Sequence, residues 1–499
     1  MLGVLMSILD TTIVNVAIAT LARDFQTSLV TIQWVSTGYL LALATVIPLT
    51  GWAADRFGTK RIYMVAIVLF MCGSALSGLA WSAGSLIAFR VLQGLGGGMI
   101  MPAGVTILTR IAGSQRVGRA LSLIGVAATL GPILGPVLGG WIVEDFSWRW
   151  IFYINVPIGL LALVLAWALL PRDRPATADR LDALGVVLLS PGLAALVYGL
   201  AQTESSGGLG SAKVLLGLGA GVALVAAFVW HSLRAPHPLL DVRLFRSRAV
   251  AAAAATTFLL TAAFYGMLLM LPLYYQVVRG SSPLVAGLLL APRGLGAGIA
   301  LFMSGRIVDR SGPGKVVLPG LAVAALSTLP WTQVTASTSH WLLGGAQFVQ
   351  GLGMGMAMQP ALAGAYQTLE RAELPRATAA LSTIRRIGSS IGVALLAVVL
   401  EHQITATIPA ADGKGLGAVV QAPAGPVAPE LAHAFAHTSW WALALTALAV
   451  IPALLLPRTR PQPKGEPPDA HNRDARRTRP ALGGRRAHAD RAHAPRPTN

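Results

Sequence analysis

Long apolar stretches separated by short basic loops run along almost the whole chain. Each stretch is long enough to cross a bilayer as a helix, which takes roughly 20 residues. The pattern therefore predicts an all-α integral membrane protein with 14 transmembrane helices. The expected spans are residues 1–22, 32–53, 62–80, 83–108, 117–143, 149–170, 183–202, 213–232, 249–278, 284–307, 315–334, 341–367, 377–400 and 438–457.

The loops between these stretches differ in charge from one side to the other. Alternate loops carry eighteen Lys and Arg residues, and the opposite set carries five. Cytoplasmic loops collect Lys and Arg, so the richer set is expected to face the cytoplasm. Because the number of spans is even, both termini are expected there as well, with the protein in a bacterial plasma membrane.

An internal repeat relates the two ends of the chain. The pattern G-x-x-x-D-R-x-G occurs in GWAADRFGTKR (residues 51–61) and again, 254 positions later, in GRIVDRSGPGK (residues 305–315). VLQGLGGGM recurs as FVQGLGMGM after 257 positions, and an Ala-Leu-Ser segment recurs after 260. Two homologous six-helix halves with a site between them are a transporter architecture. The expected parts are an N-terminal six-helix bundle (1–170), an inserted two-helix region (171–245), a C-terminal six-helix bundle (246–457) and a disordered basic cytoplasmic tail (458–499).

Composition narrows the class further. The chain is 54% hydrophobic and only 12% charged, whereas soluble domains are about a quarter charged. A single cysteine, Cys72, excludes a disulfide framework or a cysteine-based metal site. Part of the net charge of +18 lies after residue 456, where eleven basic residues face four acidic ones. That tail either attracts anionic lipid or is an unselected extension. No folded module accompanies its charge, so nucleic-acid binding is not expected.

One carboxylate, Asp10, lies deep inside a predicted span. Its insertion costs about 2.5–3.5 kcal/mol, which calls for a compensating role. Either Asp10 takes up and releases a proton, or an arginine on a neighbouring helix holds it permanently. Arg90 is the candidate partner for proton coupling, because Gln347 takes its place in the second repeat and the fold does not require the charge. The other basic residues inside spans are Arg293, Arg385 and Arg386.

The repeated loop motif predicts a gate on the cytoplasmic side. Asp55 lies at a helix end beside basic residues and glycines, so the cluster can hold the two halves together until they move apart. The alternative is that these charges only set the topology. The candidate gate residues are Gly51, Asp55, Arg56, Gly58, Lys60, Arg61, Asp309 and Arg310.

The fifth span contains GPILGPVLGG, in which glycines at a spacing of four leave one face of the helix bare. Two prolines each remove a hydrogen bond and bend the helix. Ordinary packing of small residues between helices is the alternative. The motif comprises Gly131, Pro132, Gly135, Pro136, Gly139 and Gly140. Runs such as GLGGG lack the strand–turn–helix context of a dinucleotide site, which excludes that interpretation.

Aromatic, amide and methionine side chains are the expected lining of an apolar substrate cavity. The candidates are Trp34, Tyr39, Gln93, Phe264, Tyr265, Gln347 and Met354. Packing in the core or against lipid is the alternative for each of them. A single deep carboxylate favours a monovalent or lipophilic cation as the cargo, and neutral or acidic compounds remain open.

Five motifs occur in order along the chain: LDTTIVNVA (9–17), GWAADRFGTKR, RVLQG (90–94), GPILGPVLGG and WRWIFYINVPIG (148–159). Together they resemble the major facilitator superfamily, in its fourteen-span drug/proton antiporter branch of the EmrB/QacA type. The resemblance covers residues 1–457. It implies proton-driven export of amphipathic, often cationic compounds, and it marks GPILGPVLGG as the antiporter motif.

The sequence thus predicts a proton-coupled secondary active exporter, an antiporter of amphipathic drugs or natural products that works by alternating access. A dedicated exporter of one endogenous metabolite or lipid, or a non-transporting membrane sensor, are the alternatives. No P-loop is present, so ATP is not the expected energy source. No enzyme is expected, because no His/Asp/Glu constellation lies inside the spans. The expected partners are a small-molecule substrate and the lipid bilayer, with no nucleic acid, no metal, no cofactor beyond the proton as coupling ion, and a monomeric state.

Overall fold

The structure is a computed structural model that describes residues 2–27, 29–113, 116–171, 181–202, 211–281, 283–370, 373–407 and 427–458. Within these ranges the secondary structure is helical and contains no strand. The first set of helices packs around α5, which contacts α2 and α4, while α1 lies against α6 and α4 against α8. This set comprises α1 (Leu2–Asp24), α2 (Leu29–Val46), α3 (Leu49–Phe57), α4 (Thr59–Gly78), α5 (Ala83–Ala112), α6 (Val117–Asp145), α7 (Trp150–Tyr153) and α8 (Asn155–Leu169).

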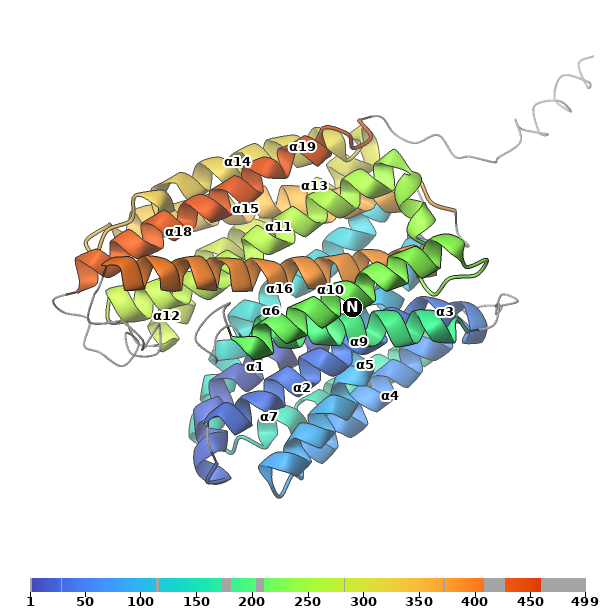
Figure 1. Ribbon diagram of the computed structural model, residues 1–499, viewed down its shortest axis with the longest axis horizontal. Helices are drawn as coiled ribbons and strands as arrows, with labels where there is room; N and C mark the ends of the chain where they lie inside the picture. The colour runs from blue at the N-terminus through green and yellow to red at the C-terminus, as the bar shows by residue number, and fades with distance from the viewer. Residues whose placement is uncertain are drawn as a thin grey trace, which may run out of the picture. The chain divides into compact units, whose positions relative to one another are not determined.

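The second set repeats this pairing with later helices. Here α15 contacts α13 and α14, α11 lies against α16, and α14 lies against α18 (Figure 1). The repeat seen in the sequence is therefore also a repeat of helix packing. The set comprises α11 (Arg248–Leu273), the π-helix η2 (Tyr274–Val278), α12 (Pro283–Leu289), α13 (Ala291–Ser311), α14 (Gly314–Thr332), α15 (His340–Tyr366), α16 (Leu374–Thr407), α18 (Ala428–Leu448) and α19 (Val450–Ala453).

Glycines allow the closest of these helix contacts. A Cβ added to Gly94 of α5 would lie 2.5 Å from the Tyr39 carbonyl oxygen of α2, and one on Gly96 would lie 2.5 Å from a backbone nitrogen of α4. Their counterparts 257 positions later, Gly351 and Gly353 of α15, approach the backbones of α13 and α14 in the same way. The glycine-rich runs therefore serve close helix packing, as small residues do in lipid.

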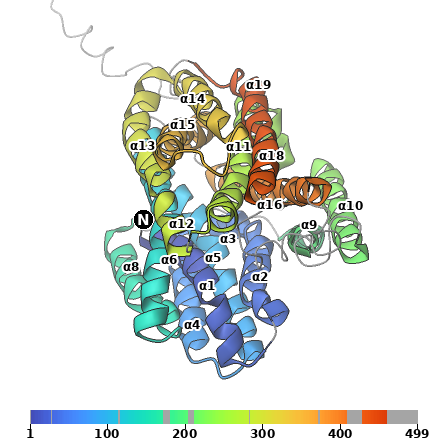
Figure 2. The same ribbon diagram turned by 90° about the vertical axis from the view of Figure 1, so that its left-hand side faces the viewer.

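Two further helices lie between the sets in the chain and beside them in space. They are α9 (Ala183–Gln202) and α10 (Ala212–Arg234), followed by the 3-10 helix η1 (Val242–Arg246). The two pack on each other, and α9 also contacts α2 and α16 (Figure 2). The two large sets meet where α6 lies against α13 and α3 lies against α16.

Helical segments occupy all fourteen predicted positions, with differences at their ends. Ten helices among the described residues are long and apolar enough to cross a membrane, and the α2–α3 pair makes an eleventh. That pair bends by 55° at Ile47 and Pro48, where the proline lacks the N–H that would continue the helix. The protein is thus a multi-pass membrane protein, and the number fourteen stays a prediction.

The last helix begins earlier than the sequence predicts. In the structure α18 starts at Ala428, ten residues before the start of the predicted span at position 438. Glu430 and two histidines lower the hydropathy of this first part, yet Leu431 and Phe435 are buried in the second set. The polar side chains lie on the opposite face of this part of α18. A search for continuously apolar stretches therefore missed its first ten residues, which are apolar on one face only.

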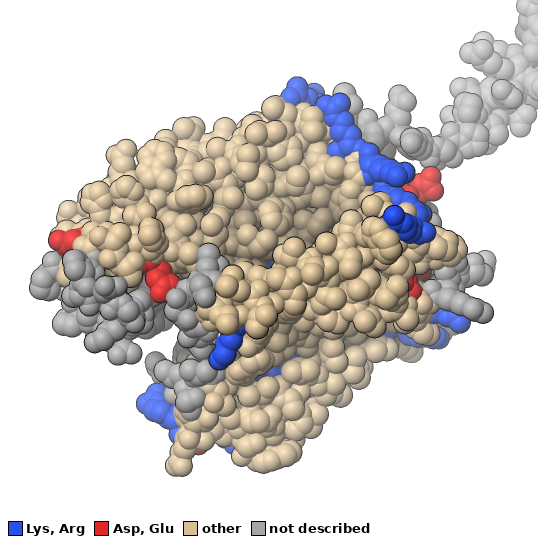
Figure 3. All heavy atoms as spheres, in the orientation of Figure 1, with Lys and Arg blue, Asp and Glu red and all other residues tan. Residues whose placement is uncertain are grey.

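The surface fits a lipid environment. Large apolar side chains such as Trp167, Leu216 and Trp341 are exposed, which a soluble protein of this size avoids. Figure 3 shows Lys and Arg gathered mainly at the right-hand end of the face drawn, with the middle of the face almost free of charge. The apolar middle matches the hydrocarbon core of a bilayer.

Candidate functional site

The Asp10 carboxylate is fully buried within the first set and binds three side chains. Arg90 donates from Nη1 to Oδ2 at 2.6 Å, and Gln93 donates from Nε2 to Oδ1 at 2.8 Å. Asn155 donates from Nδ2 to Oδ1 at 2.9 Å. Because all three groups donate, Asp10 acts here only as an acceptor, as an ionised carboxylate does.

The helices place these residues together for local reasons. Arg90 and Gln93 are three positions apart on α5, so they share one face. Arg90 also donates to Gln93 Oε1 at 2.7 Å and to the Val35 carbonyl oxygen at 3.3 Å. Asn155 begins α8 after the break at Ile154 that ends α7. The Asp10 site thus joins α1, α5 and α8.

A second layer of contacts holds the Asp10 site. The Arg90 guanidinium lies 4.2 Å from the ring centre of Tyr39, whose hydroxyl lies 3.3 Å from Ser7 Oγ. Asn155 donates to Ser74 Oγ at 3.0 Å, and Ser74 in turn donates to a backbone carbonyl of α7 at 2.8 Å. Buried charges in lipid are tolerated when they are paired and hydrogen-bonded in this way.

Sequence reasoning paired Asp10 with Arg90 but missed Asn155 and Ser74. Asn155 is the one amide in the segment 148–159, within an otherwise apolar and aromatic run. An isolated amide inside a span is itself a signal, because it needs a buried partner.

Two acidic residues bridge the two sets at one end. Asp55 of α3 accepts a hydrogen bond from Arg376 Nε of α16 at 3.2 Å. Asp309 of α13 accepts one from the Gly118 N–H of α6 at 2.9 Å and lies 3.8 Å from Arg119 Nε. We call Asp55–Arg376 the α3–α16 latch, and Asp309 with Gly118 and Arg119 the α6–α13 latch.

The two latches have the same construction. A Cβ added to Gly51 would lie 3.1 Å from the Arg376 Cα, and one added to Gly305 would lie 3.1 Å from the Arg119 Cα. In each case a glycine four residues before the aspartate lets one helix approach the start of the other. The first half supplies the aspartate of one latch, and the second half supplies that of the other.

The other predicted gate residues lie around the two latches, and some of them make further contacts within their own set. Lys60 donates to the Trp167 and Leu170 carbonyl oxygens at 2.8 and 2.6 Å, so it caps the end of α8 within its own set. Gly58 makes the turn between α3 and α4 with φ of 88°, a conformation that glycine adopts without strain. Arg56, Arg61 and Arg310 have exposed side chains. Arg376, Gly118 and Arg119 supply the bridging partners that the prediction lacked.

The glycine stripe of α6 lies against α1, the helix that carries Asp10. A Cβ on Gly131 would overlap Ile8, and one on Gly135 would overlap Thr12. Gly139 also faces α1, and Thr12 Oγ1 donates to the Gly131 carbonyl oxygen at 3.2 Å. Gly140 meets nothing within 4 Å. The side chains of Pro132 and Pro136 lie outside the described residues.

Only part of the predicted substrate cavity forms one site. Phe264, Tyr265 and Met354 line a small cavity of about 40 Å³ together with Arg385 of α16. Tyr39 and Gln93 belong instead to the Asp10 site.

Two other predicted cavity residues also lie elsewhere. Gln347 donates to the Tyr275 hydroxyl at 3.0 Å and to a backbone carbonyl of α12 at 3.1 Å. The ring of Trp34 lies 5.9 Å from that of Tyr198 on α9. Gln347 therefore joins helices within the second set, and Trp34 joins α2 to the inserted pair.

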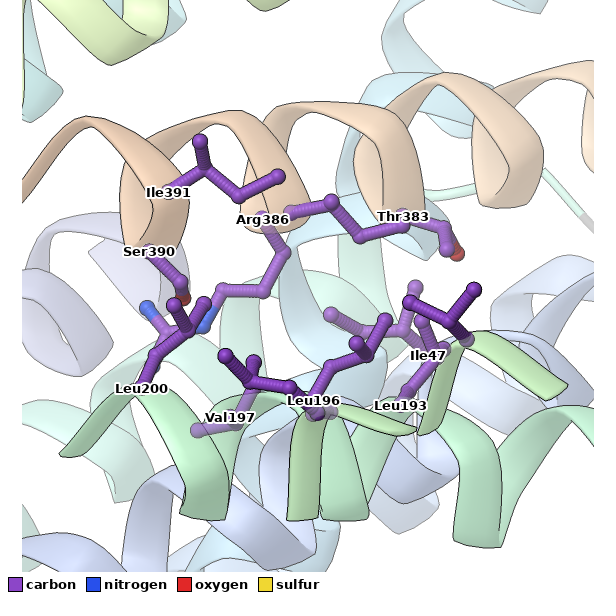
Figure 4. Close-up of a pocket in the computed structure, with 13 residues that line it drawn as sticks. Ile47, Leu193, Leu196, Val197, Leu200, Thr383, Arg386, Ser390 and Ile391 are labelled. Atoms are coloured by element: carbon purple, nitrogen blue, oxygen red, sulfur yellow. The ribbon is translucent and has the colours of Figure 1, made fainter. Parts of the chain in front are cut away.

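A larger, apolar cavity of about 270 Å³ lies between α16, α2 and the inserted helices. Figure 4 shows Arg386 reaching from α16 past Ser390 toward Val197 and Leu200 of α9. No residue of this cavity was predicted to line it, because its walls combine α2, the inserted pair and α16, which lie far apart in the sequence.

Comparisons with known proteins place these features in a family. A profile of the Major Facilitator Superfamily matches residues 1–393 and 281–487. The chain is 41% identical over 478 residues to the multidrug resistance protein B homolog of Mycobacterium tuberculosis, covering 92% of this chain and 88% of that protein. It is 33% identical to the multidrug export protein EmrB of Haemophilus influenzae, covering 79% and 78%. The solved structure of the human organic anion transporter MFSD10 shares the fold with a TM-score of 0.60 and 15% identity, covering 91% of this chain and 97% of that one.

Proposed function

Because the chain belongs to the major facilitator superfamily, we propose that it is a proton-coupled exporter of amphipathic drugs or natural products that works by alternating access. The relatives named for multidrug resistance and export support the export of drugs. The observation that carries the coupling step is the buried Asp10, held by donors from α5 and α8.

Protonation of Asp10 changes what its partners can do. A carboxylic acid keeps acceptor capacity but must place one proton, and it no longer carries the charge that balances Arg90. A buried arginine whose partner is neutralised is destabilised by several kcal/mol. The arrangement of α1, α5 and α8 therefore differs in stability between the two protonation states of Asp10. That difference is what couples proton uptake to a change in conformation.

The two latches supply the conformational part of the cycle. With Asp55–Arg376 and Asp309–Gly118 in contact, the halves 1–170 and 246–457 are held together at this end. We propose that this end faces the cytoplasm, with both termini on the same side, because the loops there carry most of the basic residues. Cargo then leaves on the opposite side and enters when the latches open.

A proton gradient is a sufficient energy source. One charge moving through 100 mV releases about 2.3 kcal/mol, and about 1.4 kcal/mol corresponds to a tenfold gradient. One proton exchanged for one neutral cargo molecule moves one net charge and thus supports a cargo gradient of roughly fortyfold. Neither ATP nor a resident cofactor is needed, and a monomer contains the complete site.

The test compares Asp10→Asn with Asp24→Asn in everted membrane vesicles. Asp24 lies on the same helix and also faces an arginine, Arg149 at 3.7 Å, but its side chain is half exposed. We expect Asp10→Asn to abolish dye accumulation driven by a proton gradient while retaining gradient-free exchange of the dye. Asp24→Asn should keep both activities. Gradient-driven accumulation by Asp10→Asn would overturn the proposal.

A double variant separates proton exchange from a permanent ion pair. If Asp10 and Arg90 only hold each other, neutral hydrogen-bonding residues at both positions will preserve gradient-driven transport. If Asp10 carries the proton, Asp10→Asn with Arg90→Gln will stay uncoupled although the buried charges are gone. Restored coupling in the double variant contradicts the proposal.

A further inference from the structure

The second half contains one buried arginine, Arg293, and two partly buried ones, Arg385 and Arg386, for which the described residues provide no acid. Among the described residues, Arg293, Arg385 and Arg386 take part in none of the ion pairs. Arg293 on α13 is only 4% exposed, and its Nε and Nη1 have no hydrogen-bond partner. Leaving a charged group buried and unpaired is costly in a membrane.

The repeat shows how unusual this arrangement is. Gly94 approaches the carbonyl oxygen of Tyr39, and Gly351 approaches that of Arg293, so Tyr39 and Arg293 occupy equivalent positions 254 residues apart. In the first half the cation, Arg90, meets Asp10 of α1. In the second half Arg293 meets Phe264 of α11, the counterpart of α1. The second site thus has a cation and an aromatic ring where the first has a cation and a carboxylate.

Phe264 links Arg293 to a small cavity that Arg385 also lines. The Arg293 guanidinium lies 4.4 Å from the centre of the Phe264 ring and donates a long hydrogen bond of 3.4 Å to the Phe264 carbonyl oxygen. Phe264 also lines the small cavity together with Tyr265 and Arg385, whose Nε has no partner either. Gly125 of α6 closes this cavity from the first half. It therefore lies where the two halves meet.

We infer that the cargo carries an acidic group, such as a carboxylate, phenolate or phosphate. Arg385 binds this group in the cavity, and Arg293 attracts it through its charge from its position against Phe264, while Phe264 and Tyr265 contact the apolar body of the cargo. An arginine binds such groups through charge-assisted hydrogen bonds. The cavity now holds only a small group, and it widens when Gly125 moves away with the first half. The inference rests on the proposed export function and names its substrate class. It replaces the cation that the lone carboxylate suggested, because Asp10 is already saturated by three donors.

The test uses two xanthene dyes of opposite charge and similar shape. Fluorescein methyl ester is an anion when its phenol is ionised, and rhodamine B ethyl ester is a cation. Binding to the full-length protein in phosphatidylcholine nanodiscs is followed by fluorescence polarisation. We expect the anion to bind about tenfold more tightly than the cation, since one charge-assisted hydrogen bond accounts for that difference. Equal binding, or a preference for the cation, overturns the inference.

Single substitutions test whether Arg385 causes the preference for the anionic dye. Arg385→Gln should weaken binding of the anion about tenfold and leave the cation unchanged, and Arg385→Lys should restore part of the loss. Arg306→Gln is the matched control, because Arg306 lies 4.4 Å from the centre of the Phe302 ring on the same helix as Arg293, but on the surface. A similar loss for both dyes in Arg385→Gln contradicts a role in charge recognition.

The melting temperature of an Arg293 variant distinguishes a role in cargo binding from a role in supporting the fold. Arg293→Met removes an unpaired buried charge, so the ligand-free protein should melt at a higher temperature. The same variant should lose the stabilisation that the anionic dye gives to the wild type. A lower melting temperature for ligand-free Arg293→Met would show that Arg293 supports the fold, and would overturn its role in cargo binding.

Two further measurements show whether the acidic group belongs to a lipid head group or to a free compound, and they separate this inference from the proposed function. Adding phosphatidylglycerol to the nanodiscs should displace the anionic dye from the wild type if a lipid head group is the acid, and should leave it bound if a free compound is. In either case Asp24→Asn should bind the anion as the wild type does, because Asp24 lies outside both sites. The dye preference is read without a proton gradient and the coupling is read with one, so failure of one proposal leaves the other intact.

Discussion

Asp55 accepts a hydrogen bond from Arg376 although 321 positions separate the two residues in the chain. The contact joins the end of α3 to the start of α16, and its counterpart joins Asp309 to Gly118 at the start of α6. Each half therefore contributes one aspartate and one helix start. Two crossed contacts of this kind cannot open one at a time without tilting a half, so the latches are expected to open together.

Breaking the α3–α16 latch should increase the exposure of the interface between α6 and α13. Arg376→Gln removes the positive charge of the α3–α16 latch. A partly exposed ion pair contributes about 1 kcal/mol, which corresponds to roughly a fivefold change in population. Ser122 of the α6–α13 interface is buried, so a Ser122→Cys reporter in a Cys72→Ser background should react faster with a maleimide. The exchange of Asp55→Arg with Arg376→Asp should return the rate toward that of the parent. Unchanged labelling in Arg376→Gln would mean that the latches are independent.

The glycine stripe of α6 should tolerate a methyl group at one position and not at another. Gly135→Ala would drive a Cβ into Thr12 of α1, whereas Gly140→Ala meets open space. Forced overlap in a packed interior costs about 1–3 kcal/mol. We expect Gly135→Ala to lower the melting temperature and the transport rate, with Gly140→Ala as the matched control. Equal behaviour of the two variants would show that α1 and α6 do not need this approach.

The stability of the inserted helices α9 and α10 should depend on pH through Asp182, which immediately precedes α9. Burial acts to raise the pKa of this carboxyl, but hydrogen bonds from the Gly185 N–H, His231 and the Leu239 N–H outweigh burial and hold the pKa below its ordinary value. A depressed pKa stabilises the folded state above the ordinary value of about 3.9, and the stabilisation is lost as the pH falls through the lower folded value.

Asp182→Asn measures this contribution. Near neutral pH the variant should show faster hydrogen exchange in α9 and α10 than the wild type, and the difference should shrink below about pH 4. Asp241→Asn is the control, because Asp241 caps only the short η1 helix through the Arg243 N–H. A difference that grows on acidification would contradict the assigned sign.

Lys60 should stabilise the end of α8 rather than the gate. Its ammonium donates to two carbonyl oxygens at that helix end, a favourable position for a cation that contributes about 0.3–1 kcal/mol. Lys60→Gln should therefore lower the melting temperature slightly and leave labelling of the Ser122→Cys reporter unchanged. Lys213→Gln, at an exposed position on α10, should change neither. Faster labelling in Lys60→Gln would restore Lys60 to the gate.

The sequence alone predicted the helical class, the repeat and the pairing of Asp10 with Arg90. Those predictions rest on local signals: apolar length, repeated motifs and a charge that needs a partner. Arg376 was counted only as a loop charge, because nothing near it in the chain shows that it meets Asp55. Tyr39 was placed in the cavity because an aromatic side chain fits either site, and only the packing of α2 on α5 shows that it lies under Arg90.

The Asp10 site joins α1, α5 and α8, whereas in the second half Gln347 occupies the position equivalent to Arg90, and Arg293 meets Phe264 rather than an acid. Because the second half has no carboxylate paired with Arg293 among its described residues, the side chains around Arg293 can change without disturbing a proton step at Asp10. Substitutions that alter which compounds are bound should accordingly fall around Phe264 and Arg385 rather than around Asp10.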